Sequence, residues 1–156
     1  WARTYGLEYI ILRPTNNYGI GQYPEKLIPL AVKSLIRGRQ ISLHNDGTPV
    51  RNWLHASDTA DAVILLIDEG VKNEIFNVAG GFEQSNIRTA SKIITEYYGA
   101  GTMPGNHVDF SRGRDGQDMR YALDDSKLRS LGWGPKKEFD QEIGSIVKYY
   151  KENFIW

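Results

Sequence analysis

The chain has 156 residues, with 19 basic and 19 acidic side chains, so its formal net charge is zero. This balance argues against nucleic acid or a membrane surface as the partner, because both attract a basic excess. The lack of cysteine excludes disulfides and thiolate chemistry, and the lack of an apolar run of 18 residues predicts no membrane span. We expect a cytoplasmic globular protein. Because the chain opens with Trp rather than Met, we also expect it to be part of a longer protein.

The first 23 residues predict the end of an α/β sheet. Trp1 to Tyr5 can form the last turn of a helix, closed by Gly6. Residues 8–13 are apolar in their middle, which is typical of a parallel strand buried on both faces, and Pro14 ends it. Residues 15–23 then form a loop at the edge of the sheet where open α/β folds bind ligands.

The middle of the chain predicts a helix, two strands and a turn. Residues 24–37 form the helix and Gly38 ends it. Its expected inner face is Leu27, Leu30, Ala31, Ser34 and Leu35. Residues 41–44 and 50–55 are short strands, joined by a hairpin-type turn at residues 45–47.

The rest of the chain alternates helices with short strands. Capping residues predict four more helices, which start at Ser57-Asp58, Asn86, Asp124 and Asp140. The first three end near residues 69, 98 and 131. The last has an apolar stripe at Ile143, Ile146, Val147 and Tyr150. Strands are expected at residues 75–79 and 108–110. The fold class is therefore α/β, with one late sheet strand followed by a small α+β lobe.

Three places could carry binding chemistry, and each has a structural alternative. Asn16 and Asn17 can hold a phosphate or a sugar hydroxyl, or simply make a turn. Arg51 needs an anion if it points inward, but it can also lie at the surface. The loop at residues 111–121 carries Arg112, Arg114 and Arg120, which suit a diphosphate or a solvated loop balanced by aspartates.

Histidines give weaker signals. His44 could stack on a base or lie at the surface. His55 and His107 have no ligand spacing, so we expect no metal site.

Several catalytic motifs are absent from these 156 residues. There is no glycine-rich turn of the dinucleotide type and no Ser-His-Asp arrangement with a nucleophile turn. There is also no Tyr-x-x-x-Lys, because Tyr23 and Lys26 are one residue too close.

The motifs taken together resemble one family in order and spacing. The matching runs are Arg-Pro-Thr-Asn-Asn-Tyr-Gly at 13–19, Pro-Glu-Lys-Leu-Ile-Pro at 24–29, Val-Arg-Asn-Trp-Leu-His at 50–55, Phe-Asn-Val-Ala-Gly at 76–80, Gly-Gln-Asp-Met-Arg-Tyr-Ala-Leu-Asp at 116–124 and Leu-Gly-Trp at 131–133. This pattern is similar to the extended short-chain dehydrogenase/reductase family of nucleotide-sugar enzymes. The first two runs resemble its 4,6-dehydratases, whereas the others are shared with epimerases and decarboxylases.

The resemblance implies that this chain is the C-terminal half of such an enzyme. Residues 1–23 would be the tail of a Rossmann domain, and residues 24–156 would mainly form the nucleotide-sugar-binding lobe. NAD would be bound mainly by the missing N-terminal half, which would also carry the catalytic residues, so these 156 residues alone are expected to be inactive. The intact enzyme would be a homodimer.

The resemblance also implies roles for particular residues. Pro14 and Thr15 would lie near the nicotinamide. The nucleotide-diphosphate sugar would be contacted by Asn16, Lys26, Leu27, His44, Arg51, Asn77, Arg114, Gln117 and Tyr121. Two positions depart from the family pattern, because His44 stands where the dehydratases have Tyr and Gln117 stands where they have His.

The function implied is the substrate-binding half of an NAD-dependent 4,6-dehydratase that converts dTDP-glucose to dTDP-4-keto-6-deoxyglucose in deoxysugar biosynthesis. The alternatives are half of a UDP-sugar 4-epimerase or decarboxylase, or a non-catalytic nucleotide-sugar-binding module. In a half-enzyme the first strand would lack neighbours, so we expect Ile10, Ile11 and Leu12 to be more exposed than in a core strand or covered by another copy.

Overall fold

The computed structural model describes residues 1–111, 113, 116 and 118–153. Its helices are α1 (Ala2–Tyr5), α2 (Leu27–Ile36), α3 (Ala56–Asp68), α4 (Asn86–Tyr98), α5 (Ser126–Arg129) and α6 (Phe139–Asn153), with 3-10 turns at Asn45–Gly47 and Pro104–His107. Its strands are β1 (Ile10–Pro14), β2 (Asn16–Tyr18), β3 (Ile41–Ser42), β4 (Val50–His55), β5 (Glu74–Val78), β6 (Phe82–Ser85) and β7 (Val108–Asp109).

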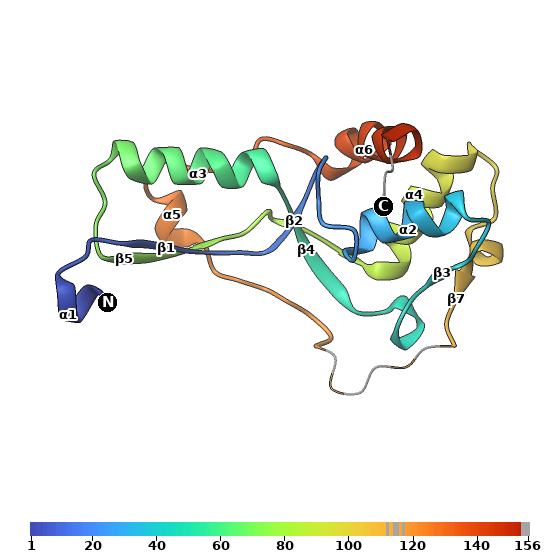
Figure 1. The fold of residues 1–156 in the computed structure, drawn as a ribbon, viewed down its shortest axis with the longest axis horizontal. Coiled ribbons are helices and arrows are strands. Elements are labelled where there is room, and N and C mark those ends of the chain that lie inside the picture. The colour runs from blue at the N-terminus through green and yellow to red at the C-terminus, as the bar shows by residue number, and fades with distance from the viewer. Residues whose placement is uncertain (112, 114–115, 117, 154–156) are drawn as a thin grey trace.

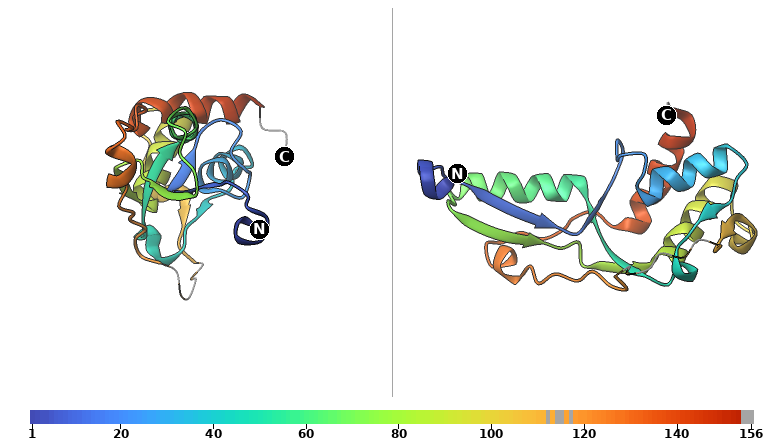
Figure 2. Two further views of the ribbon diagram at one scale, coloured as in Figure 1. Left: turned by 90° about the vertical axis from the view of Figure 1, so that its left-hand side faces the viewer. Right: turned by 60° about the horizontal axis from the view of Figure 1, so that its bottom comes forward.

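The molecule is elongated, with a hydrophobic cluster toward each end (Figures 1 and 2). At one end β1 and β5 lie beside α3 and α5. At the other end α2, α4 and α6 pack together near β3 and β7. Strands β2, β4 and β6 lie between the two ends. The α/β class predicted from the sequence is confirmed.

Most strand pairs are parallel. Strand β1 pairs with β5, β2 with β4, and β3 with β7, all in parallel, whereas β4 and β6 are antiparallel. The hairpin predicted between residues 41 and 55 is wrong, because β3 and β4 have different partners. Asn45 and Asp46 have positive φ, but they form a 3-10 turn that leads the chain from one sheet to another.

Strand β1 lies at a sheet edge. It has one strand neighbour, β5, among the described residues. Ile10 and Leu12 pack on the cluster formed by α3, β5 and α5, whereas Ile11 faces the other way and is 43% exposed. The expectation of burial on both faces is therefore wrong for this chain, and the expectation of an exposed edge strand is confirmed. Alternating side chains of a two-stranded sheet with one covered face give this result.

The larger core is formed by α2, α4 and α6 against the central strands. Tyr18, Trp53, Phe82 and Phe139 form an aromatic group within it, with ring centroids 4.9 to 6.2 Å apart in the contacting pairs. The predicted stripe of the last helix is confirmed, because its four apolar members are all buried.

All four predicted helix caps differ from those in the structure. Asp125 is the N-cap residue of α5, although the predicted Asp124 accepts from the Ser126 N–H at 2.9 Å, and Asp140 lies within the first turn of α6. His55 caps α3, with its Nδ1 accepting from the Ser57 N–H at 3.2 Å. Ser85 caps α4 by accepting from the Arg88 N–H. Asp58 is instead buried in the first turn of α3, where it accepts a bond from the Lys137 N–H at 3.1 Å.

Other local predictions also need correction. Helix α2 begins at Leu27, and its buried residues include Ile28 and Val32, whereas Leu30 is 42% exposed. Strand β2 lies in the predicted loop at residues 15–23, and β6 has no counterpart in the prediction; both form by pairing with the two edges of β4. In the described residues no helix is long and apolar enough to cross a membrane.

Candidate functional site

A pocket of about 390 Å³ lies where β1 gives way to β2 and α2. Its lining residues are Thr15, Asn16, Asn17, Gln22, Tyr23, Lys26, Leu27 and Trp53. The structure therefore brings together four of the predicted site residues: Thr15, Asn16, Lys26 and Leu27. The pocket lies beyond the carboxyl end of a parallel strand, which is the usual ligand side of an open α/β sheet.

The two adjacent asparagines have different surroundings. Asn17 donates from Nδ2 to the Thr15 carbonyl at 3.1 Å, and its Oδ1 accepts from the Thr59 hydroxyl at 2.7 Å. The Asn16 side chain has no hydrogen bond to another described residue. Asn17 therefore fixes β2 against α3, whereas the Asn16 amide makes no hydrogen bond to a described residue that a ligand would have to replace.

The amino end of α2 favours an anion at this pocket. Lys26 is the N-cap residue and gives no side-chain cap to the helix. The main-chain N–H groups in the first turn of α2 therefore have no side-chain acceptor among the described residues. The positive end of the helix dipole also lies at this end of the helix, beside the pocket. Lys26 itself adds an exposed ammonium group with no ion pair to a described carboxylate. A phosphate group suits such a position.

Arg51 is buried beside the pocket rather than in its lining. Its Nη1 donates to the Val50 carbonyl at 2.7 Å and to the Asp118 carbonyl at 3.1 Å. The guanidinium carbon lies 4.5 Å from the centre of the Tyr121 ring. Arg51 shares a face of β4 with Trp53, which lines the pocket two residues further along the strand.

The other predicted residues lie elsewhere or cannot be placed. Asn77 donates from Nδ2 to the Asp124 carbonyl at 2.9 Å, which ties β5 to the segment before α5. His44 is half-buried at the start of the 3-10 turn. Pro14 ends β1. Arg114 and Gln117 lie outside the described residues.

Tyr18, which follows the two asparagines in β2, is a neutral core residue. Burial raises its pKa above the ordinary tyrosine value, and the nearby Glu142, Asp58 and Asp140 add to the effect. Its hydroxyl is buried without a hydrogen-bond partner among the described residues. Tyr18 is therefore suited to packing rather than to proton transfer near neutral pH.

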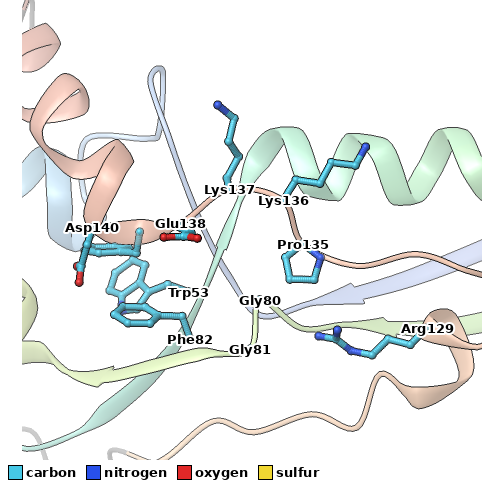
Figure 3. A pocket seen from close by; sticks show the side chains of 11 residues that line it. Trp53, Gly80, Gly81, Phe82, Arg129, Pro135, Lys136, Lys137, Glu138 and Asp140 are labelled. Atoms are coloured by element: carbon cyan, nitrogen blue, oxygen red, sulfur yellow. The ribbon is translucent and has the colours of Figure 1, made fainter.

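A second cavity, of about 450 Å³, lies between the turn at Gly80–Gly81 and residues 135–140 (Figure 3). Its basic residues are already paired with carboxylates: Arg129 with Asp125, Lys136 with Asp61, and Lys137 with Glu142. In Figure 3 the two lysines extend away from the cavity. Its cations are thus less available to a phosphate than Lys26 is.

Three pocket residues were not predicted to bind: Gln22, Tyr23 and Trp53. Their local sequence gives little signal, because Gln22 and Tyr23 sit in a loop and Trp53 reads as a core residue. The pairing of β2 with β4, which places Asn16 opposite Trp53, brings them to one place.

These residues do not by themselves form a dinucleotide site. The chain has no glycine-rich turn. Thr15, expected near the nicotinamide, is buried, with its hydroxyl donating to Asn52 and accepting from the Gly80 N–H.

Relatives in sequence cover the whole chain. It is 39% identical to dTDP-glucose 4,6-dehydratase from Streptomyces niveus over 157 aligned residues, which is 100% of this chain and 46% of that protein. It is 34% identical to dTDP-glucose 4,6-dehydratase 1 from Escherichia coli, again over 100% of this chain and 44% of that protein. The chain thus spans about half the length of these relatives.

Solved structures show the same relation. A dTDP-glucose 4,6-dehydratase from Streptomyces venezuelae with NAD and dTDP bound matches with a TM-score of 0.87 and 37% identity, over 97% of this chain and 46% of that one. UDP-glucose 4-epimerase from Thermotoga maritima, with UDP-glucose, matches with a TM-score of 0.80 and 28% identity, over 98% and 49%.

The match to a family is also direct. Residues 1–79, half of the chain, match the NAD dependent epimerase/dehydratase family. That segment includes β1, the pocket loop, the start of α2 and the strand that carries Arg51. The chain therefore belongs to the NAD dependent epimerase/dehydratase family.

Proposed function

We propose that this chain is the nucleotide-sugar-binding portion of a dTDP-glucose 4,6-dehydratase, which converts dTDP-glucose to dTDP-4-keto-6-deoxyglucose. The observation that carries the proposal is the 39% identity to such an enzyme over the full chain. The pocket supports it, because Lys26 and the start of α2 offer positive charge and Asn16 offers an amide for a hydroxyl or phosphate.

The proposed role of these residues is binding and orientation. Lys26 and Leu27 hold the nucleotide portion, Asn16 contacts the diphosphate or sugar, and Arg51 with Tyr121 extends the site. His44, Asn77, Arg114 and Gln117 complete the proposed substrate contacts, and Pro14 and Thr15 are proposed to lie near the nicotinamide. NAD supplies the hydride transfer in such chemistry.

We also propose the larger organisation that accompanies this role. Residues 1–23 belong to the tail of the NAD-binding domain, and residues 24–156 mainly form the substrate lobe. The intact enzyme is a homodimer in which NAD is held mainly by other residues.

A binding panel tests the substrate class. The chain is titrated with the glucose conjugates of dTDP, UDP, GDP and ADP by calorimetry. We expect dTDP-glucose to bind most tightly. Lys26→Ala should weaken the binding of dTDP-glucose. Lys148→Ala, on the exposed side of α6, is the control and should leave this binding unchanged. The likeness to UDP-glucose 4-epimerase makes that enzyme the second candidate, and tighter binding of UDP-glucose would favour it. Binding of none of the four would reject both.

A turnover assay tests whether these 156 residues act in binding alone. The 156-residue chain, supplied with NAD and dTDP-glucose, should form no 4-keto product, because these residues offer no dinucleotide turn and no Tyr-x-x-x-Lys pair. Product formation by this chain would contradict the binding-only role.

A further inference from the structure

A buried polar contact joins three segments of the chain beside the candidate pocket. The Thr15 hydroxyl donates to Asn52 Oδ1 at 3.1 Å, and the Gly80 N–H donates to the same oxygen at 2.9 Å. The Gly80 N–H also lies 3.3 Å from Thr15 Oγ1. Asn52 is 6% exposed and Thr15 is 8% exposed. One amide oxygen thus connects the end of β1, the middle of β4 and the turn after β5.

The third segment approaches β4 without space for a side chain. A Cβ placed on Gly80 would lie 1.7 Å from the Trp53 carbonyl oxygen and 2.9 Å from the Leu54 Cα. Figure 3 shows this turn, with Gly80 and Gly81 coming up to the strand that carries Trp53. The main chain at Gly80 is therefore packed directly on β4, where its N–H reaches Asn52.

The contact lies behind two groups of candidate ligand-binding residues. Thr15 and Asn16 follow β1 and line the pocket. Arg51 and Trp53 flank Asn52 in β4 and point to the opposite face of that strand. The main-chain pairing of β2 with β4 places Asn16 opposite Trp53, and Asn52 adds a side-chain contact from β4 to Thr15, the residue before β2.

We propose that Asn52 is a positioning residue that holds the Thr15–Asn16 side of the pocket in register with Arg51 and Trp53. This inference rests on the proposed function, because it assigns the register to nucleotide-sugar binding. An amide oxygen has two lone pairs and can accept both bonds at once. Without it, the Thr15 hydroxyl loses its acceptor and the Gly80 N–H keeps only the longer contact to Thr15 Oγ1, so the three segments are held less firmly. A site held in place before binding loses less entropy when the ligand arrives.

The experiment compares three variants of the full chain. Asn52→Leu removes the acceptor, and Asn52→Asp keeps an oxygen that can accept both bonds. Thr89→Val is the control for lost stability, because Thr89 is fully buried in α4, with its hydroxyl on the Ser85 carbonyl, away from the pocket. The first measurement is amide hydrogen exchange at Gly80 and residues 16–18 without ligand, and the second is the dissociation constant for dTDP.

For Asn52→Leu we expect exchange at these amides to rise, and dTDP binding to weaken, by about ten-fold each. Asn52→Asp should restore most of both, and Thr89→Val should lower the melting temperature without changing either. Unchanged exchange and affinity in Asn52→Leu would overturn the proposal, as would an equal loss of affinity in Thr89→Val.

Two further outcomes are also decisive. If the parent chain does not bind dTDP, the proposed function fails, and the exchange data still decide whether Asn52 holds the segments together. If Asn52→Leu does not fold, Thr15→Val replaces it, because this isosteric change removes the hydroxyl that donates to Asn52 and lies 3.3 Å from the Gly80 N–H. Faster exchange at residues 16–18 in that variant supports the proposal, and unchanged exchange contradicts it.

Discussion

Asn16 and Asn17 are neighbours with separable roles. Both polar side-chain atoms of Asn17 are bonded, Nδ2 to the Thr15 carbonyl and Oδ1 to the Thr59 hydroxyl of α3. Asn17→Ala should therefore lower the free energy of unfolding by about 1–3 kcal/mol, because it leaves buried groups unpaired. Asn16→Ala should change stability by less than about 0.5 kcal/mol but weaken dTDP-glucose binding. Urea unfolding and calorimetry measure the two effects, and the reverse pattern would contradict the assignment.

Tyr18 and Tyr150 differ in what their hydroxyls contact. The Tyr150 hydroxyl donates toward the carbonyls of Gly19 and Gln22, at 3.2 and 3.3 Å, whereas that of Tyr18 has no partner among the described residues. Tyr150→Phe should cost about 1–2 kcal/mol of unfolding free energy at pH 7, and Tyr18→Phe should be neutral or stabilising. Thermal or urea unfolding of the two variants checks this.

The same two tyrosines predict a loss of stability in alkali. Burial is the main cause that raises the pKa of each above its ordinary value. A tyrosine whose pKa is higher in the folded state holds its proton more tightly there. The stability that each protonated tyrosine contributes to the folded state is therefore complete below the unfolded-state pKa of about 10. It is lost as the pH rises above that value. The unfolding free energy should fall between pH 9 and 11, and it should fall less steeply in Tyr18→Phe than in the parent chain. An equal fall in both proteins would show that Tyr18 does not cause the loss of stability.

Gly80 is a position where no side chain fits. Its Cβ would overlap the Trp53 carbonyl at 1.7 Å. Gly80→Ala should therefore destabilise the chain by more than about 3 kcal/mol or prevent folding, because backbone cannot move aside as a flexible side chain can. Gly105→Ala is the matched control, since nothing lies within 4 Å of its Cβ position and its φ is not positive. A Gly80→Ala variant with the parent melting temperature would contradict the packing described.

At the scale of elements, the helices could be predicted from the sequence because their signals are local. Apolar spacing and end residues placed α3, α4 and α6 to within a few residues. Strands β2 and β6 could not be predicted, because Asn16–Tyr18 and Phe82–Ser85 are short and largely polar and become strands only by pairing with β4. The same pairing explains why the site was predicted in part: Asn16, Lys26 and Leu27 lie in a recognisable motif, but Asn52 and Trp53 reach the site through contacts distant in sequence.

The exposed edge of β1 predicts self-association. Ile11 is exposed on the outer face of a strand whose other edge has no strand partner among the described residues, and such edges invite pairing with another chain. Ile11→Lys should reduce the association measured by light scattering across a concentration series. Ile20→Lys, at an exposed residue outside the strands, is the control and should leave it unchanged. A parent chain that stays monomeric at high concentration would contradict this prediction.

For the whole molecule, two packed ends connected by β2, β4 and β6 place the candidate pocket between them. The residues after β1 supply one side, α2 supplies the amino end of a helix, and β4 supplies Trp53, with Arg51 buried beside the pocket. This arrangement is shared over nearly the full chain with family members about twice as long. The central claim is that these elements together bind the nucleotide diphosphate.

The most direct test is an NMR titration of the isotope-labelled chain with dTDP. The account predicts saturable shifts of the amide signals at residues 15–18, 22–27, 51–53 and 118–121. Arg51→Ala should weaken the binding of dTDP by about 2–4 kcal/mol, as expected when a buried charge partner is removed. Shifts confined to the cavity at residues 135–140, or an Arg51→Ala variant that binds as tightly as the parent, would contradict it.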